Sequence, residues 1–255
     1  MEAPAGAVDF VELAPENYVG SGGQWRRRLD AIRERYPVLT HGLSLSMGGE
    51  APFDPSFLAA VAGFLRDVES PWHSDHLCWS STEETHFHEL LPIPFTRKNL
   101  ERVVARVKHV QNMMPVRFAI ENVSAYARHA EDEMSEAAFV REVVEQSGCA
   151  LLLDVNNVFV NSQNFGGNAW STLAELPLES VVQIHIAGFS REAPDLVIDT
   201  HGAAIDEGVY GLLTAALART GPVPVLLERD HDIPAFEVLA AEIERIRAIG
   251  REVLG

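Results

Sequence analysis

Six short apolar segments of this chain each end on a residue that metal ions favour as a ligand. The segments are β-branched or leucine-rich and are bounded by turn residues, a pattern typical of buried strands. Their last residues are His41, His76, Glu121, Asp154, His185 and Glu228. Burial of a histidine or a carboxylate at a strand end is unfavourable unless another group or an ion pairs with it. We therefore expect these strand ends to meet in one pocket.

The six segments belong to a regular alternation of strand-like and helix-like sequence. Seven strands are predicted, at residues 9–13, 38–43, 72–79, 117–122, 150–155, 181–188 and 224–228. Helices are predicted between them, beginning at the capping residues Asp54, Thr96 and Ser135 and, for the last helix, running from Pro234 to about Val253. Gly148 is expected to end the third of these helices in a left-handed conformation. Strand, helix and strand at this spacing indicate right-handed crossovers and a parallel sheet.

This alternation predicts an α/β fold, a TIM-type (β/α) barrel, with residues 1–255 in a single domain. A barrel gathers the carboxyl ends of its strands around one mouth, where active sites are built. A closed barrel of this type has eight strands, so the seven found here predict a barrel that lacks its first strand. An open doubly wound sheet is the alternative, but it would place ligand-binding groups at one switch point and not on nearly every strand.

Charge and composition disfavour several classes of partner. The chain carries 37 acidic against 20 basic residues, a formal net charge of −17, which disfavours nucleic acids and anionic membranes. No apolar run is long enough to span a membrane, and the first residues do not resemble a secretory signal. Two cysteines, Cys78 and Cys149, cannot form a disulfide framework, so we expect a cytoplasmic protein.

The polar strand ends suit iron, manganese or zinc, which take imidazole and carboxylate ligands. A later segment, VIDTHGAA, adds Asp199 and His201, whose side chains would point the same way in extended backbone. Asn157, in DVNNV, could add an amide oxygen. These donors are too many for one ion and suitable for two or three. Because crowded carboxylates repel one another, such a pocket would also require cations for its stability.

Each of these residues also has a reading without a metal. A single histidine at a strand end is commonly a hydrogen-bonded core residue, and a single acid often caps the next helix. Asp154 in particular could begin an Asx turn. The chain has no HExxH, no CxxC and no glycine-rich phosphate loop. The metal prediction therefore rests on the joint occurrence of the six strand ends, and the residues alone leave the identity of the metal open.

Longer motifs resemble a known family along nearly the whole chain. They include ELAPENYVGSGG, HGLSLSMGG, SDHLCWS, AIENVSAY, LLLDVNNVF, QIHIAGF, DTHG and LLERDHDIP. These segments are similar to the multinuclear non-heme iron-dependent oxidative enzymes, the family of MbnB and TglH. The resemblance implies a barrel of the xylose-isomerase type. The glycine-rich opening strand usual in that family is missing here, in agreement with the count of seven strands.

The resemblance also implies a distribution of ligands over three irons. Glu121, Asp154, His185 and Glu228 would hold the first ion. His41 and His76 would hold the second, with Glu121 as a bridge between the two. Asn157, Asp199 and His201 would hold the third, sharing Asp154 with the first. Two or three ions in mixed Fe(II) and Fe(III) states are implied, with Glu121 and Asp154 as the catalytic residues.

The reaction that the resemblance implies is an oxidation by O₂ of cysteine residues in a ribosomally synthesised precursor peptide. A small partner protein would present the peptide. Three other functions are compatible with metal-binding residues on a barrel: an endonuclease IV-like phosphodiesterase with zinc, a sugar isomerase, and a non-catalytic metal-binding scaffold. The acidic balance disfavours the first. The scarcity of lysine, with only Lys98 and Lys108 and neither at a strand end, disfavours the second.

Overall fold

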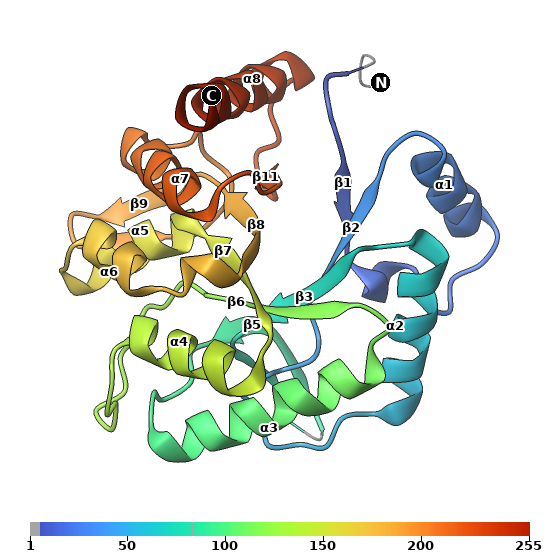
Figure 1. Ribbon diagram of the computed structural model, residues 1–255, viewed down its shortest axis with the longest axis horizontal. Helices are drawn as coiled ribbons and strands as arrows, with labels where there is room; N and C mark the ends of the chain where they lie inside the picture. The colour runs from blue at the N-terminus through green and yellow to red at the C-terminus, as the bar shows by residue number, and fades with distance from the viewer. Residues whose placement is uncertain (1–5, 83) are drawn as a thin grey trace.

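Seven parallel strands form the centre of the molecule and curve into a nearly closed barrel (Figure 1). The computed structural model describes residues 6–82 and 84–255. In sheet order the strands are β1 (Val11–Leu13), β2 (Val38–Gly42), β3 (Trp72–His76), β6 (Arg117–Glu121), β7 (Ala150–Asp154), β8 (Val181–Ile186) and β11 (Val225–Leu227). In the described part of the chain, β1 and β11 are the two edges of this sheet. The predicted barrel of seven strands is confirmed, and the open doubly wound alternative is wrong.

Helices lie on the outside of the sheet. They are α1 (Gln24–Arg33), α2 (Pro55–Val68), α3 (Arg97–Met113), α4 (Glu136–Ser147), α5 (Val155–Phe165), α6 (Ala169–Glu175), α7 (Glu207–Thr220) and α8 (Phe236–Leu254), with short 3₁₀ turns at Pro15–Asn17 and Leu178–Ser180. The predicted capping residues Asp54, Thr96 and Ser135 each accept a hydrogen bond from a backbone N–H in the first turn of their helix. Gly148 ends α4 with φ 74°, as predicted.

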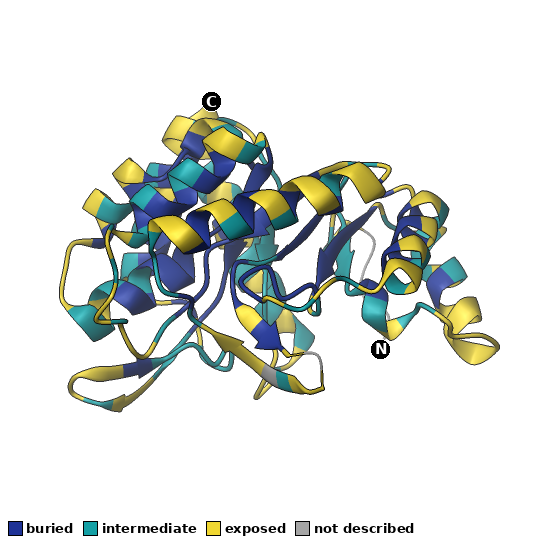
Figure 2. Ribbon diagram, turned by 90° about the horizontal axis from the view of Figure 1, so that it is seen from below, coloured by how far each residue is buried: buried dark blue, intermediate teal, exposed yellow. Residues whose placement is uncertain are grey.

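Two antiparallel hairpins interrupt the alternation of strands and helices. The first joins β4 (Trp79–Ser81) to β5 (His86–Leu91), and the second joins β9 (Ser190–Ala193) to β10 (Leu196–Ile198). Both extend from the body of the barrel (Figure 2). The segment that contains His86 and His88 pairs with β4 and is therefore a strand. The side chain of His88 lies outside what the structure describes.

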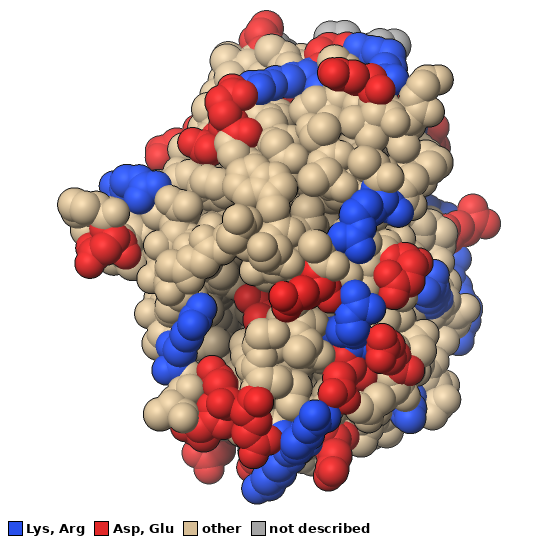
Figure 3. Space-filling model, turned by 60° about the vertical axis from the view of Figure 1, so that its left-hand side comes forward, with Lys and Arg blue, Asp and Glu red and all other residues tan. Residues whose placement is uncertain are grey.

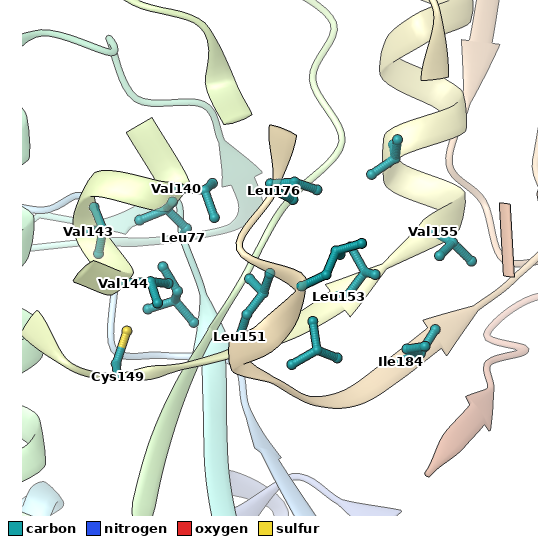
Figure 4. Close-up of a cluster of buried hydrophobic side chains, with 14 of the residues drawn as sticks. Leu77, Val140, Val143, Val144, Cys149, Leu151, Leu153, Val155, Leu176 and Ile184 are labelled. Atoms are coloured by element: carbon teal, nitrogen blue, oxygen red, sulfur yellow. The ribbon is translucent and has the colours of Figure 1, made fainter. Parts of the chain in front are cut away.

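Alternation along each strand separates the core from the barrel interior. Leu151 and Leu153 of β7 join the apolar core between the sheet and the helices, which Figure 4 shows where α4, β7 and β8 meet. Leu152, between them, belongs to a separate cluster with Ala119 and Ala150. Because successive side chains of a strand point to opposite faces, Asp154 lies on the same face as Leu152. The same two-residue period aligns Glu121 with Ala119, so both carboxylates face the barrel interior.

Candidate metal centre

The polar strand ends converge inside the mouth of the barrel. Four groups of histidine and acidic residues each have their ligand atoms within 4.8 Å of one another. The groups share members and therefore form one continuous cluster, made of Glu12, His41, His76, Glu121, Asp154, His185, His201 and Glu228. Each of the seven parallel strands contributes a member at or near its carboxyl end, and His201 comes from the segment between β10 and α7. Register explains the convergence, because His76 pairs with Glu121 and Asp154 pairs with His185 on neighbouring strands.

On one side of the cluster, His41 and His76 face Glu121. The Nε2 atoms of the two histidines lie 3.1 Å apart, and they are 3.1 Å and 3.4 Å from Glu121 Oε2. Two imidazole nitrogens at this distance require a proton or a cation between them. Donor atoms bound about 2.1 Å from one ion lie roughly 3.0–3.4 Å from each other. The three separations match that spacing.

In the middle of the cluster, His185 connects several carboxylates. Its Nδ1 lies 3.3 Å from Glu228 Oε1 and 3.5 Å from Glu121 Oε1. Its Nε2 lies 3.1 Å from Oε1 of Glu12, a residue of β1. Glu121 therefore faces histidines with both oxygens, His185 with Oε1 and the pair His41 and His76 with Oε2. A carboxylate placed in this way can bridge two cations.

On the other side, the segment after β10 joins the cluster. His201 Nε2 lies 2.8 Å from Asp199 Oδ1, and His201 Nδ1 lies 3.3 Å from Glu228 Oε2 and 3.1 Å from Asp230 Oδ2. The sequence predicted that Asp199 and His201 point the same way from extended backbone. They do meet, but His201 has φ 49°, in the left-handed region that is unusual for a residue with a side chain. A sharp bend, and not a straight strand, brings the two together.

Asn157 lies beside Asp154 in the first turn of α5. Its backbone N–H donates to Asp154 Oδ1 at 2.8 Å, so Asp154 caps this helix in addition to facing the cluster. The Asn157 side chain donates through Nδ2 to the carbonyl of Asn122, and Asn122 in turn donates to the carbonyl of Asp154. These contacts hold the Asn157 amide in one orientation.

Several buried side-chain atoms of the cluster have no hydrogen-bond partner among the described residues. They are His76 Nδ1, Glu121 Oε2, Asp154 Oδ2, Asn157 Oδ1, His185 Nδ1 and His201 Nε2. A buried polar atom without a partner costs about 1–3 kcal/mol, and more when it is charged. Five of these six atoms belong to histidines or acids, and two of those five, Glu121 Oε2 and His185 Nδ1, lie in the contacts of 3.1–3.5 Å described above without hydrogen-bond geometry. The donor set therefore fits a group of cations.

The buried carboxylates of the cluster need positive charge close to them. Burial, together with Asp199 and Glu121, raises the pKa of Asp154 well above its usual range. Burial opposes protonation of His41, but the carboxylates of Glu121 and Glu12 outweigh it and raise the pKa of His41 to about 9. In the absence of metal, protons must supply the positive charge that the carboxylates need. Metal binding would displace those protons.

Family models and known proteins identify this architecture. The model of the RiPP precursor modification enzymes MbnB/TglH/ChrH matches residues 1–251. The chain belongs to this family. The membership predicted from the motifs is thereby confirmed, and the family places the chain among enzymes that modify the precursors of ribosomally synthesised peptides.

Relatives and solved structures agree with this assignment. A UPF0276 protein of Pseudomonas aeruginosa is 43% identical over 244 residues, which are 96% of this chain and 85% of the relative. A UPF0276 protein of Caulobacter vibrioides is 40% identical over 241 residues, with 94% and 86% covered. D-psicose 3-epimerase from Clostridium cellulolyticum has a TM-score of 0.63 at 13% identity, covering 96% of this chain and 89% of its own. Endonuclease IV from Thermus thermophilus has 0.56 at 15% identity, covering 91% and 83%. These two structures show the xylose-isomerase-like barrel fold.

Sequence reasoning missed one member of the cluster, Glu12. The predicted first strand includes it, but no role was assigned to it. The signal was present in the strand itself, because Val11 and Leu13 pack outward against α1 and α2 residues and therefore place Glu12 on the interior face. Asp230, two residues after Glu228, contacts His201.

Proposed function

We propose that this protein is a multinuclear non-heme iron enzyme that uses O₂ to oxidise cysteine residues of a ribosomally synthesised precursor peptide. Membership in a family of precursor-modifying enzymes supplies the peptide as the substrate class. The donor set supports a metal centre, and iron and oxidation by O₂ are what the resemblance to the non-heme iron enzymes implies. The observation that carries the proposal is the group of buried imidazole and carboxylate atoms that face one another without partners among the described side chains.

The ligands divide into three overlapping groups. Glu121, Asp154, His185 and Glu228 would hold one iron, and His41 with His76 would hold a second that shares Glu121. Asp199, His201 and the side-chain oxygen of Asn157 would hold a third, close to Asp154. When bound, iron in the Fe(II) and Fe(III) states would supply electrons to O₂ and a positive site that holds the substrate thiolate.

The protein's own cysteines do not compete with a substrate thiol. Cys78 and Cys149 are both buried. Burial raises the pKa of each thiol above its ordinary value, which disfavours the reactive thiolate. The oxidised cysteine would therefore come from another chain, the precursor peptide. We further propose that a small partner protein presents that peptide, and that the reaction takes place in the reducing cytoplasm.

Two rival functions on the same fold receive less support. A phosphodiesterase that follows a nucleic-acid backbone benefits from a continuous basic groove. On the face shown in Figure 3, the basic side chains are instead separated from one another by acidic and uncharged ones. For sugar isomerisation, no lysine lies at a strand end to assist the substrate. Among the described residues, no helix is long and apolar enough to cross a membrane.

The test is iron quantification with electron paramagnetic resonance on protein that is prepared without air. We expect two or three irons per chain, and O₂ consumption only when the precursor peptide and its partner protein are added. Mass spectrometry of the peptide should then show a change confined to cysteine. Protein that carries zinc and cleaves DNA at abasic sites, or that holds its full iron content but consumes no O₂ with its peptide, would disprove the proposal.

A further inference from the structure

Glu12 faces the Nε2 atom of His185, whereas Glu121 and Glu228 face its Nδ1 atom, although an oxygen of Glu12 and one of Glu228 lie within 4.8 Å of each other. The two oxygens of Glu12 are 3.1 Å and 3.3 Å from His185 Nε2, while His185 Nδ1 faces Glu228 and Glu121. The His185 side chain is completely buried, and that of Glu12 is only 7% exposed. Each nitrogen of one imidazole therefore faces carboxylates, and only one of the two nitrogens can face the same ions as Glu121.

A chain of hydrogen bonds fixes the orientation of Glu12. Trp72 Nε1 can only donate, and it donates to Gln183 Oε1 at 2.9 Å. The amide of Gln183 must then present its Nε2 to Glu12, where it donates to Oε2 at 2.6 Å. This bond holds the carboxylate in place and leaves it able to accept a second hydrogen from His185.

We infer that Glu12 is a positioning residue that selects the metal-binding nitrogen of His185. Glu12 accepts the hydrogen of His185 Nε2, which leaves the lone pair of Nδ1 directed at the space beside Glu121 and Glu228. The inference rests on the proposed function in one respect, that His185 binds a metal. A carboxylate behind a metal-bound imidazole fixes the ring and makes the coordinating nitrogen more basic.

His41 provides the opposite arrangement in the same cluster. Its Nδ1 lies 2.8 Å from Ser74 Oγ, which donates its own hydrogen to the carbonyl of Thr40 and so accepts from His41. Nε2 of His41 is thereby left to face His76 and Glu121. His185 would thus bind a metal ion through Nδ1 and His41 through Nε2. In each ring, the group that accepts a hydrogen from the other nitrogen determines which nitrogen binds.

One contact favours the reverse tautomer of His185 and is outweighed. Gln183 Nε2 lies 2.9 Å from His185 Nε2 and could donate to it. That arrangement would leave Glu12 Oε1 buried without the hydrogen from His185 and would place a hydrogen on Nδ1, between the carboxylates and the ion they hold. A hydrogen bond from imidazole to an ionised carboxylate is about twice as strong as a neutral one.

The direct test is the protonation pattern of the histidine rings in zinc-loaded protein, since zinc is diamagnetic. Long-range proton–nitrogen correlation spectra of protein labelled at histidine distinguish a protonated ring nitrogen from a metal-bound one. We expect hydrogen on Nε2 of His185 and, as an internal contrast, on Nδ1 of His41. The His185→Gln variant assigns the signals. Hydrogen on His185 Nδ1 would overturn the inference while leaving the proposed function intact, whereas wild-type protein that binds neither zinc nor iron would overturn both.

Variants give a second measurement, the affinity for zinc and for Fe(II) in competition with a chelator. Glu12→Gln should weaken binding by about 10- to 100-fold, the usual effect of removing such an outer carboxylate. Glu12→Asp keeps the charge but has a shorter side chain that no longer extends to His185 Nε2, so it should weaken metal binding as well. The matched control is Glu136→Gln, which removes a partly buried carboxylate bonded to Asn161 and not to an imidazole. Folded Glu12→Gln protein with unchanged affinity would contradict the inference.

Discussion

The two faces of the same seven strands differ sharply in composition and in what stabilises them. Outward residues such as Leu151, Leu153 and Ile184 join one apolar core with the helices. Inward residues at the carboxyl ends are acids and imidazoles, which are close together and only partly hydrogen-bonded. One residue along a strand thus separates a position stabilised by burial from a position that needs a cation. The comparison teaches that the outward apolar core can stabilise the barrel while acids and imidazoles in its interior still lack partners.

The largest effect is expected from Glu121→Ala, on the inward face. Glu121 faces His41 and His76 with one oxygen and His185 with the other, so its loss should remove more than one metal per chain and abolish oxidation of the peptide. Elemental analysis of the purified variant measures this. Glu101→Ala, an exposed position on α3, is the control. A Glu121→Ala protein with the wild-type metal count would show that this carboxylate does not bridge.

Removal of metal should destabilise the wild-type fold without changing its outward core. A ligand at a thousand times its dissociation constant stabilises the native state by about 4 kcal/mol. Chelation should therefore lower the thermal midpoint of the wild type, as calorimetry would show, and should have much less effect on Glu121→Ala. Equal sensitivity of the two proteins to the chelator would mean that the stabilising ions bind elsewhere.

Two adjacent residues of β7 test the two faces directly. Leu153→Ala should lower the free energy of unfolding by about 3 kcal/mol, since Leu153 is fully buried against the helices, and folded protein should keep its metal. Asp154→Asn keeps an oxygen to cap α5 but removes a negative charge from the cluster, so it should lose metal, and among metal-free proteins it should change the free energy of unfolding less than Leu153→Ala does. Denaturant unfolding and metal analysis on both variants separate the effects. Loss of metal from Leu153→Ala together with retention of metal by Asp154→Asn would contradict the alternation described for β7.

A smaller effect is expected where α4 begins, on the outside of the barrel. Ser135 accepts a hydrogen bond from the N–H of Ala138, and Ser135→Ala should cost about 1 kcal/mol in denaturant unfolding. Ser135→Thr retains the hydroxyl and should restore most of the loss. Metal content should be the same in all three proteins, and a decrease in either variant would show that the helix start affects the cluster.

The smallest effect is expected from His109→Ala. His109 lies on α3 and stacks on Phe53, outside the cluster. Metal content should not change, and the free energy of unfolding should change by no more than about 0.5 kcal/mol. Loss of metal from this variant, measured beside the wild type, would mean that the position of the centre is wrong.

The sequence could predict the features that depend on local patterns, but not the distances between residues on different strands. Strands, helix caps at Asp54 and Thr96, and the stop at Gly148 depend on local patterns, and these predictions are confirmed. The hairpin at β4 and β5 was missed, because its short strands alternate poorly and its pairing requires a register shift. The proximity of the inward strand ends was inferred from the barrel, but distances between them depend on strand register, which no local pattern reveals.

The role of Glu12 shows most clearly what the sequence could not predict. Its partners His185 and Gln183 are 173 and 171 residues away in the sequence. Because β1 and β8 are not neighbours in the sheet, their contact is made across the barrel interior. Only the curvature of the whole sheet brings them together, whereas the pairing of Asp154 with His185 on adjacent strands follows from sheet order alone.

The barrel carries a seam between β1 and β11, where side chains provide the connection that backbone hydrogen bonds provide elsewhere. Arg247 of α8 reaches across to Asp9 at 2.7 Å and to the carbonyl of Gly6 at 3.1 Å. The three residues of β1 pair with one neighbour only, as do those of β11, so Glu12 stands on one of the two least anchored strands of the sheet. Local opening of the molecule begins at such an edge. Hence the carboxylate that contacts His185 Nε2 would be the first part of the proposed centre to loosen.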